Sequence, residues 1–272
     1  MHATTGATDM AALKLAKQQL RGLMKSRLAA ISRESTATQS TYSLSTHIHL
    51  LTCPGRLAFE ALKSFQPYKE ARHISVYLSM PGGEIQTDAI VRDALSSGKK
   101  VFIPFLLKSD VESPGTPSRI MDMVQLHSIS DYESLKPDRW GIPSIDPITV
   151  KERRCVLGFL SEKFLDADSA LDLILMPGVA FDVAGGTRLI RRLGHGKGFY
   201  DFFIHRYMAS VASSPMPEVR TRPVLLYGLS LTEQFLCRPS DTPVPVGPFD
   251  QHLHGVIHGD GRVTTAENSF TQ

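Results

Sequence analysis

Hydrophobic residues recur at helical spacing in the first part of the chain, which runs from residue 10 to residue 31 without a proline. At about 100° per residue, one face collects Leu13, Leu20, Leu23, Met24, Leu28 and Ile31. Lys17 and Arg21 lie one turn apart at the edge of this face, where they can point into a cleft or form a solvated basic flank. The pattern predicts a helix over 10–31, capped by Thr8 or Asp9, after a disordered leader over 1–9.

Beyond residue 70, short apolar runs alternate with helical stretches. The runs over 73–79 and 100–107 predict strands, and 87–97 has a helical periodicity that stops at Gly98. A strand, a helix and a second strand within about 35 residues form a βαβ unit. Such a unit implies a parallel sheet that is covered on both faces.

The later segments continue this pattern. We expect an edge or antiparallel strand over 120–126, buried strands over 170–176 and 224–229, and a helix over 198–212. Turn-forming residues predict loops over 53–56 and 213–223, a surface excursion over 109–118, and a hairpin at Gly259-Asp260-Gly261. The sequence therefore predicts an α/β protein with a mixed, mostly parallel central sheet.

Composition and charge exclude several classes of protein. The 272 residues, 42% hydrophobic and 21% charged, suffice for one large globular domain or two small ones. The net charge of +3 offers no polycation for a nucleic-acid duplex. The longest apolar runs, 101–107 and 171–177, fall short of the about 20 residues that a membrane span needs.

The cysteines and the first residues bear on location. Cys53, Cys155 and Cys237 lie too far apart in sequence to suggest a zinc site or a disulfide framework, which favours reduced thiols in the cytoplasm. The first nine residues lack the apolar core of a secretory signal and contain Asp9. We expect a cytoplasmic protein, with a mitochondrial location as the weaker alternative.

The segment from Arg192 to Asp201 is the most informative part of the chain. Gly194, Gly196 and Gly198 alternate with His195 and Lys197 just past a buried strand, where α/β sheets place their ligands. Backbone N–H groups of glycines can approach an anion closely, and a helix that begins near Gly198 would direct its N-terminus there. Asp201 offers a hard oxygen ligand for Mg²⁺. The combination suits a magnesium-bound polyphosphate, although a loop kept only for packing would share the glycines.

The spacing does not match the common phosphate-binding motifs. No Ser or Thr follows Lys197, and the glycine spacing differs from that of the dinucleotide fingerprint. The chain does resemble the 5-formyltetrahydrofolate cyclo-ligase family, also called 5,10-methenyltetrahydrofolate synthetase. The matching segments follow one another in order: Lys17-Gln-Gln-Leu-Arg21, Ser75-Val-Tyr-Leu-Ser-Met80, Glu84, Thr87, Met121-Asp-Met123, Trp140-Gly-Ile-Pro143, Pro177-Gly-Val-Ala-Phe-Asp182, Arg192-Leu-Gly-His-Gly-Lys-Gly-Phe-Tyr-Asp201 and Val244-Pro-Val-Gly-Pro-Phe-Asp250.

The resemblance implies a fold and a reaction. The fold would be a single three-layer α/β/α domain over 10–272, similar to sugar-phosphate isomerases and CoA transferases, with surface insertions near 109–118 and 205–222. The reaction would convert ATP and 5-formyltetrahydrofolate into 5,10-methenyltetrahydrofolate, ADP and phosphate. Phosphorylation of the formyl oxygen would create a leaving group, and N10 would then attack the formyl carbon. We expect a monomer with no nucleic-acid or membrane partner.

The resemblance also implies roles for individual residues. The ATP-binding set would be Lys17, Arg21, Arg192, Leu193, Gly194, His195, Gly196, Lys197, Gly198, Phe199 and Tyr200. The folate-binding set would be Leu78, Glu84, His195, Gly196, Lys197, Gly198 and Phe199. Asp201 and Asp250 would hold Mg²⁺, and Lys197 and Arg192 would be catalytic, with Lys197 nearest the migrating phosphoryl group.

Some positions depart from the family pattern or keep a structural alternative. The chain has extra residues, 187–191, before Arg192, so that either Arg188-Leu189 or Arg192-Leu193 could fill the Arg-Leu position of the family. We prefer the second pair because it adjoins Gly194. Asp182 is expected to fix a turn, and Trp140 to lie in the core or in the wall of a cleft.

Two other function classes stay open at this point. A lengthened loop that no longer held ATP productively would leave a non-catalytic folate-binding protein. A sugar-phosphate isomerase or CoA transferase would need a catalytic carboxylate for proton abstraction or acyl transfer, and no motif in this sequence requires one.

Overall fold

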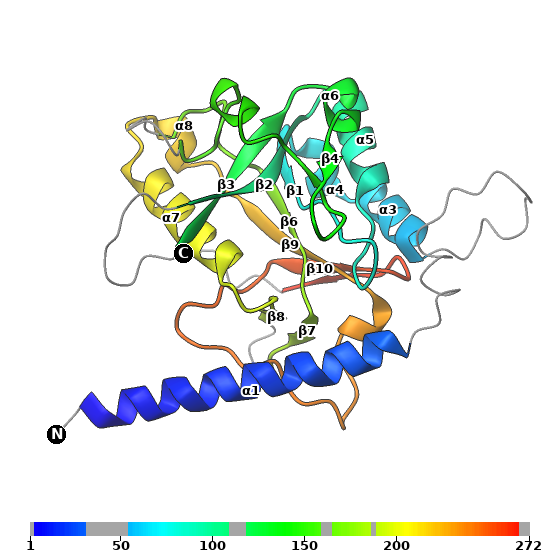
Figure 1. The fold of residues 1–272 in the computed structure, drawn as a ribbon, viewed down its shortest axis with the longest axis vertical. Coiled ribbons are helices and arrows are strands. Elements are labelled where there is room, and N and C mark those ends of the chain that lie inside the picture. Colours follow the sequence, from blue (N-terminus) through cyan, green and yellow to red (C-terminus); the bar gives the residue numbers. More distant parts are fainter. Residues whose placement is uncertain (1–2, 31–53, 109–117, 159–164, 186–188, 267–272) are drawn as a thin grey trace, which may run out of the picture.

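A seven-stranded sheet forms the centre of the molecule (Figure 1). The computed structural model describes residues 3–30, 54–108, 118–158, 165–185 and 189–266. The strand order is β11 (Val263–Thr265), β10 (Gly255–His258), β9 (Leu225–Ser230), β6 (Leu173–Met176), β1 (His73–Val76), β2 (Lys100–Lys108) and β3 (Arg119–Leu126). The five inner strands are parallel, and β3 and β11 are antiparallel at the two edges. The expected mixed, mostly parallel sheet is confirmed.

The central strands are buried on both faces because helices cover both faces. In β6, Leu173 and Leu175 face one hydrophobic cluster, whereas Ile174 and Met176 face another. This alternation is the period of two that an extended chain requires. The runs that predicted strands by their continuous apolar character are therefore interior parallel strands.

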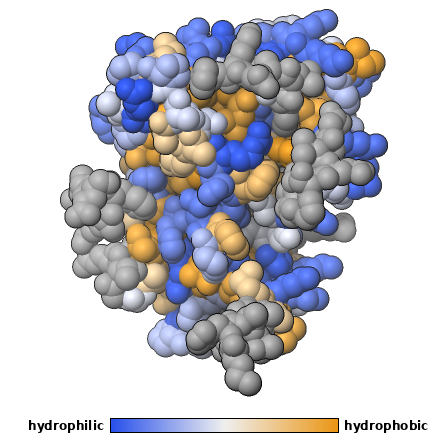
Figure 2. Space-filling view, turned by 90° about the vertical axis from the view of Figure 1, so that its left-hand side faces the viewer, coloured by the Kyte–Doolittle hydropathy of each residue, from blue (hydrophilic) through white to orange (hydrophobic). Residues whose placement is uncertain are grey.

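Two groups of helices form the outer layers (Figure 1). The first group contributes buried side chains to one face of the sheet: α3 (Pro54–Ser64), α4 (Gln66–Glu70) and α5 (Asp88–Ser96). The second group, α7 (Phe199–Ser213) and α8 (Pro217–Arg220), covers the other face. Figure 2 shows the α7 side of the molecule, where hydrophobic residues appear between hydrophilic ones. Among the described helices, none has the run of apolar residues that crossing a membrane would require.

The long helix α1 (Ala3–Ala29) packs beneath one end of the sheet (Figure 1). Its buried residues Leu20 and Met24 contact a small cluster that includes Ala180 and Leu193. These two residues belong to the hairpin of β7 (Ala180–Val183) and β8 (Ile190–Leu193), where they are paired with each other. Leu20 and Met24 of the predicted apolar face thus fix α1 against the hairpin that leads into the glycine-rich segment, whereas Leu23 of the same predicted face is 61% exposed.

Short elements complete the described fold. They are α6 (Ile129–Glu133), β4 (Lys136–Pro137), β5 (Pro143–Ser144), and the 3₁₀ helices η2 (Thr149–Glu152) and η3 (Thr232–Gln234). The antiparallel edge strand near 120–126 and the hairpin at Gly259-Asp260-Gly261 are confirmed.

Three expectations were wrong in detail. The leader over 1–9 is helical from Ala3 onward, because extending an existing helix by one residue costs far less than nucleating a new one. The segment over 53–56 is not a loop throughout, because α3 begins at Pro54; the first turn of a helix tolerates proline. The segment over 213–223 is not a loop throughout, because it contains the short helix α8; Val219 of α8 and Tyr207 of α7 are buried in the same hydrophobic cluster, so part of the segment predicted as an insertion near 205–222 contributes to the core. The excursion over 109–118 lies outside the described residues, apart from its last residue.

Candidate active site

The turn after β1 carries the buried carboxylate of Glu84, which is only 7% exposed. Its Oε2 accepts a hydrogen bond from the backbone N–H of Met80 at 3.1 Å. Its Oε1 lies 3.0 Å from Nε2 of His195, in the glycine-rich segment. A carboxylate removed from water needs such partners. This contact joins the Glu84 turn to the glycine-rich segment, 111 residues further along the chain. It agrees with the expectation that these two segments face one site.

The glycine-rich segment follows β8 and leads into α7. Gly196 has a φ of +95°, which is unfavourable for residues with a side chain. A Cβ at this position would lie 3.1 Å from Cζ of Arg21 on α1. Nε of Arg21 donates to the carbonyl of Gly194 at 2.8 Å. Burial lowers the pKa of Arg21, and nearby Asp250 opposes this shift, so that the guanidinium stays charged.

Arg192 is the most deeply buried cation of the site, with 3% of its side chain exposed. Its Nη2 lies 3.1 Å from each carboxylate oxygen of Asp201, the acidic residue in the first turn of α7. Its Nη1 donates to the carbonyl of Pro177 at 3.3 Å. A Cβ at Gly194 would approach Nη1 of Arg192 to 2.9 Å, so this glycine allows the guanidinium to lie under the loop. The preference for Arg192-Leu193 at the site agrees with this burial.

The second predicted metal ligand, Asp250, pairs with Lys17 of α1. Nζ of Lys17 lies 2.6 Å and 2.5 Å from the two carboxylate oxygens, and Oδ2 also accepts the N–H of Gly247 at 2.6 Å. The next residue, Gln251, donates its backbone N–H to Asp201 at 3.1 Å. The two carboxylates predicted to hold Mg²⁺ therefore belong to adjoining segments.

These donors fit a magnesium ion that a polyphosphate would complete. Mg²⁺ is commonly held by one or two carboxylates, together with water and substrate phosphates. No group of three or more acidic, histidine or cysteine ligands occurs among the residues with described positions, so no all-protein cage is present there. Asp201 and Asp250 are each partly exposed, at 20% and 18% of their side chains.

Two buried polar atoms at the site have no partner among the described residues: Nε of Arg192 and the hydroxyl of Tyr200. The Arg192 guanidinium lies 5.6 Å from the centre of the Tyr200 ring. Burial raises the pKa of Tyr200 far above its usual value, although the charge of Arg192 opposes the shift. The hydroxyl is therefore protonated at neutral pH and can donate a hydrogen bond. Both atoms suit a polar ligand.

The remaining predicted residues are more dispersed. Lys197 is exposed, and Phe199 and Tyr200 pack partly buried against the hydrophobic clusters. Leu78 is buried at the end of β1, in the cluster that α3 and α5 cover. Trp140 is 54% exposed and therefore not a core residue. Its neighbour Gly141 lies against Pro81 of the Glu84 turn, and the Arg139 guanidinium lies 3.8 Å from the centre of the Trp140 ring.

Asp182 anchors the hairpin below the glycine-rich segment. Its carboxylate accepts Nε and Nη2 of Arg191 at 2.7 Å and 2.6 Å, and the N–H of Val244 at 2.8 Å. The expectation that Asp182 fixes the chain locally agrees with these contacts. The hairpin continues beyond the paired strands with a bond from Ala184 N–H to the Leu189 carbonyl. Of the extra residues, Ile190 and Arg191 belong to the paired part of β8, and 187 and 188 lie outside the described residues.

Sequence reasoning missed Gln234, the last residue of η3. Its side-chain amide donates to the carbonyls of Gly83 and Gly178, both at 2.9 Å. A neutral side chain without a charge pattern gives no signal in a single sequence.

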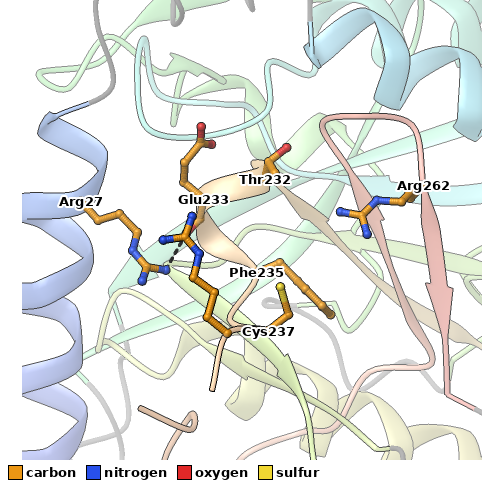
Figure 3. A pocket seen from close by; sticks show the side chains of 7 residues that line it. Arg27, Thr232, Glu233, Phe235, Cys237 and Arg262 are labelled. Atoms are coloured by element: carbon orange, nitrogen blue, oxygen red, sulfur yellow. Dashed lines mark hydrogen bonds between the residues drawn. The ribbon is translucent and has the colours of Figure 1, made fainter. Parts of the chain in front are cut away.

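A cavity of about 170 Å³ adjoins the same short helix (Figure 3) and is lined by Arg27, Thr232, Glu233, Phe235, Cys237, Arg238 and Arg262. Acidic residues already bind two of these arginines, Asp241 at Arg27 and Asp260 at Arg262.

Comparison with known proteins adds an independent line of observation. The model of the 5-formyltetrahydrofolate cyclo-ligase family matches residues 13–257. The chain is 32% identical over 245 residues to 5-formyltetrahydrofolate cyclo-ligase of Mus musculus, covering 90% of this chain and 94% of the relative. It is 28% identical over 214 residues to the enzyme of that name from Saccharomyces cerevisiae, covering 75% and 83%. The solved structure of Aquifex aeolicus 5,10-methenyltetrahydrofolate synthetase shares the fold, with a TM-score of 0.52 and 20% identity over 94% of this chain and 95% of that one.

Proposed function

The chain belongs to the 5-formyltetrahydrofolate cyclo-ligase family and is an enzyme of that class, and from this premise we propose how its site uses ATP and Mg²⁺. The product would be 5,10-methenyltetrahydrofolate, with ADP and phosphate released. The formyl group on N5 is an amide, which is a poor electrophile. The site must therefore bring a phosphoryl donor to the formyl oxygen.

The observation that carries the proposal is the contact between His195 and Glu84 at 3.0 Å. Glu84 would bind the folate, and the segment from Gly194 to Gly198 would bind the terminal phosphates of ATP. Because the two segments touch, ligands held by each would meet with their reacting atoms close together. Such positioning supplies much of the acceleration in phosphoryl transfer.

The reaction would proceed in two steps. In the first, the formyl oxygen attacks the γ-phosphorus, the bond between this phosphorus and the bridging oxygen breaks, and ADP leaves. In the second, N10 attacks the formyl carbon and loses its proton, and the carbon–oxygen bond breaks to release phosphate. The remaining five-membered ring carries the positive charge of the methenyl product.

The cations of the site have a clear task in this scheme. Lys17, Arg21 and Arg192 would neutralise the phosphates, aided by backbone N–H groups of the glycine-rich segment. Lys197 would lie nearest the migrating phosphoryl group, since its exposed side chain is not committed to the core.

Asp201 and Asp250 would hold the magnesium ion. When bound, Mg²⁺ neutralises part of the phosphate charge during transfer. Gln251 N–H and Gly247 N–H orient the two carboxylates, at 3.1 Å and 2.6 Å. The alternative of a non-catalytic folate-binding protein was based on a displaced glycine-rich loop. The β7–β8 register runs unbroken from Val183 and Ile190 to Ala180 and Leu193, and does not favour that alternative.

The test is to incubate the full chain with ATP, Mg²⁺ and 5-formyltetrahydrofolate. We expect the near-ultraviolet absorbance of the methenyl product to rise with one ADP formed per product, and no change without ATP or without Mg²⁺. Tight folate binding without ADP formation would support the non-catalytic alternative instead. We also expect the activity to elute with the monomer in size-exclusion chromatography.

A further inference from the structure

Gln234 lies at the end of η3 and is almost completely buried, with 1% of the residue exposed. Its amide nitrogen donates two hydrogen bonds, to the carbonyl oxygens of Gly83 and Gly178, each at 2.9 Å. Its amide oxygen accepts the backbone N–H of Leu231 at 2.9 Å. This third bond fixes the orientation of the amide, because only the oxygen can accept it.

The two carbonyls belong to the two loops that build the site. Gly83 directly precedes Glu84, whose carboxylate contacts His195. Gly178 follows Pro177, whose own carbonyl accepts Nη1 of Arg192. One side chain therefore connects the loop of the folate carboxylate with the loop that supports the buried arginine.

We propose that Gln234 is a positioning residue that sets the separation between Glu84 and Arg192, and hence between the folate and the phosphate donor. This inference rests on the proposed function and names a further residue for it. Gln234 contacts both loops through their backbones, so it acts through Glu84 and Arg192 on the substrates.

Glutamine is the side chain that this position requires. Two buried carbonyls need two donors on one atom, which a primary amide supplies and a carboxylate lacks. Methionine has a similar length but no donor, so both carbonyls would lose a partner. Asparagine is one methylene shorter and would lose contact with at least one of the two loops.

The consequence for catalysis follows from the loop that each bond holds. Without the bond to Gly83, the Glu84 turn is held less firmly, so the KM for 5-formyltetrahydrofolate should rise. A displacement of about 1 Å between reacting groups can cost about 10²-fold in rate. ATP is held by Arg192 together with Lys17 and Arg21 of α1, which Gln234 does not contact, so the KM for ATP should rise by a smaller factor than the KM for 5-formyltetrahydrofolate.

The experiment compares Gln234→Met and Gln234→Asn with Glu233→Gln as a matched control. Glu233 precedes Gln234 in the same short helix, but its side chain lines the neighbouring cavity (Figure 3). For folded Gln234 variants, we expect kcat/KM for 5-formyltetrahydrofolate to fall by about 10-fold to 10²-fold. In these variants, the KM for ATP should rise by a smaller factor than the KM for 5-formyltetrahydrofolate. In Glu233→Gln, we expect kcat/KM for 5-formyltetrahydrofolate and the KM for ATP to stay within about twofold of the wild type.

A second measurement does not depend on turnover or on which variant is active. Hydrogen exchange at the Met80 amide, which donates to Glu84, should be faster in Gln234→Met than in Glu233→Gln. An inactive wild-type chain would count against the proposed function, while the exchange rates would still test the positioning. The inference is overturned if hydrogen exchange at the Met80 amide is unchanged. It is also overturned if an active Gln234 variant leaves the KM for 5-formyltetrahydrofolate and the KM for ATP unchanged, or raises both by the same factor.

Discussion

Replacing Asp182 tests whether this residue anchors the phosphate-binding hairpin or holds a metal. Its carboxylate is 5% exposed and accepts three hydrogen bonds, two from Arg191 and one from Val244. Asp182→Ala removes the acceptor for all three. Asp182→Asn keeps an oxygen for the Val244 N–H and removes the charge that faces Arg191.

The expected loss of stability follows from burial. Removing one partner of a buried ion pair costs about 3–5 kcal/mol. Arg191 is 18% exposed, so water can partly solvate the freed guanidinium, and we expect about 3 kcal/mol for Asp182→Ala, near the lower end. At this chain length, about 3 kcal/mol lowers Tm by roughly 6–12 °C. Asp182→Asn should lose about 2 kcal/mol, since charged hydrogen bonds are stronger than neutral ones.

The assay is chemical denaturation, with Asp168→Asn as the control. Asp168 pairs with Lys100 at 2.7 Å, but 60% of its side chain is exposed, and such pairs contribute about 1 kcal/mol or less. We expect the Mg²⁺ dependence of folded Asp182→Asn to match the wild type. The anchoring role is refuted if Asp182→Asn is as stable as Asp168→Asn, and a raised Mg²⁺ requirement would identify Asp182 as a metal ligand.

Three further predictions concern the site and the pH dependence of stability. Lys197→Ala should lower kcat by about 10²-fold to 10³-fold without changing the denaturation midpoint, because the side chain is exposed; unchanged turnover would remove the catalytic assignment. Asp201→Asn should raise the Mg²⁺ concentration needed for half-maximal rate at fixed ATP, and an unchanged titration would contradict its role. Burial raises the pKa of Asp122 from 3.8 to about 6. Between pH 3.8 and about 6, the folded state therefore binds a proton that the unfolded state has lost. The stabilisation from protonated Asp122 decreases as the pH rises through this range. The difference in unfolding free energy between Asp122→Asn and the wild type should therefore change between pH 4 and about 6 and be constant above; a flat difference would contradict this.

The sheet could be predicted because its pattern is local. β1 and β6 are buried at every position, and β6 is apolar throughout, whereas β1 also contains the buried polar residues His73 and Ser75; α5 stops close to Gly98 as expected. The helix α3 was missed because Pro54 was interpreted as part of a loop, although proline is also favoured in the first turn of a helix. The β7–β8 hairpin gave no alternating signal because each strand has only four residues and is buried on both sides. Ala180 and Leu193 pack in the cluster of α1, whereas Phe181 and Ile190 pack in the cluster of α7.

The candidate residues of the site could be proposed from the sequence, whereas their contacts with one another could not. Lys17 and Asp250 are 233 residues apart, and Arg21 and Gly194 are 173 apart. Only the packing of α1 against the hairpin brings these partners together. Gln234 was missed for the same reason, because its function is defined by two backbone carbonyls that no sequence motif records.

The ion pairs at the site explain how a cluster of charges stays stable before substrate binds. Three of the cations expected to face phosphate contact an acid or a carbonyl: Lys17 contacts Asp250, Arg192 contacts Asp201, and Arg21 contacts the Gly194 carbonyl. In the proposed reaction, the phosphates compete with Asp250 and Asp201 for Lys17 and Arg192. The same exchange frees both carboxylates as oxygen ligands, so charge is redistributed without leaving a buried group unpaired. Because His195 contacts Glu84 at 3.0 Å, the segment proposed to bind phosphate and the residue proposed to bind folate would exchange partners within one connected set of contacts.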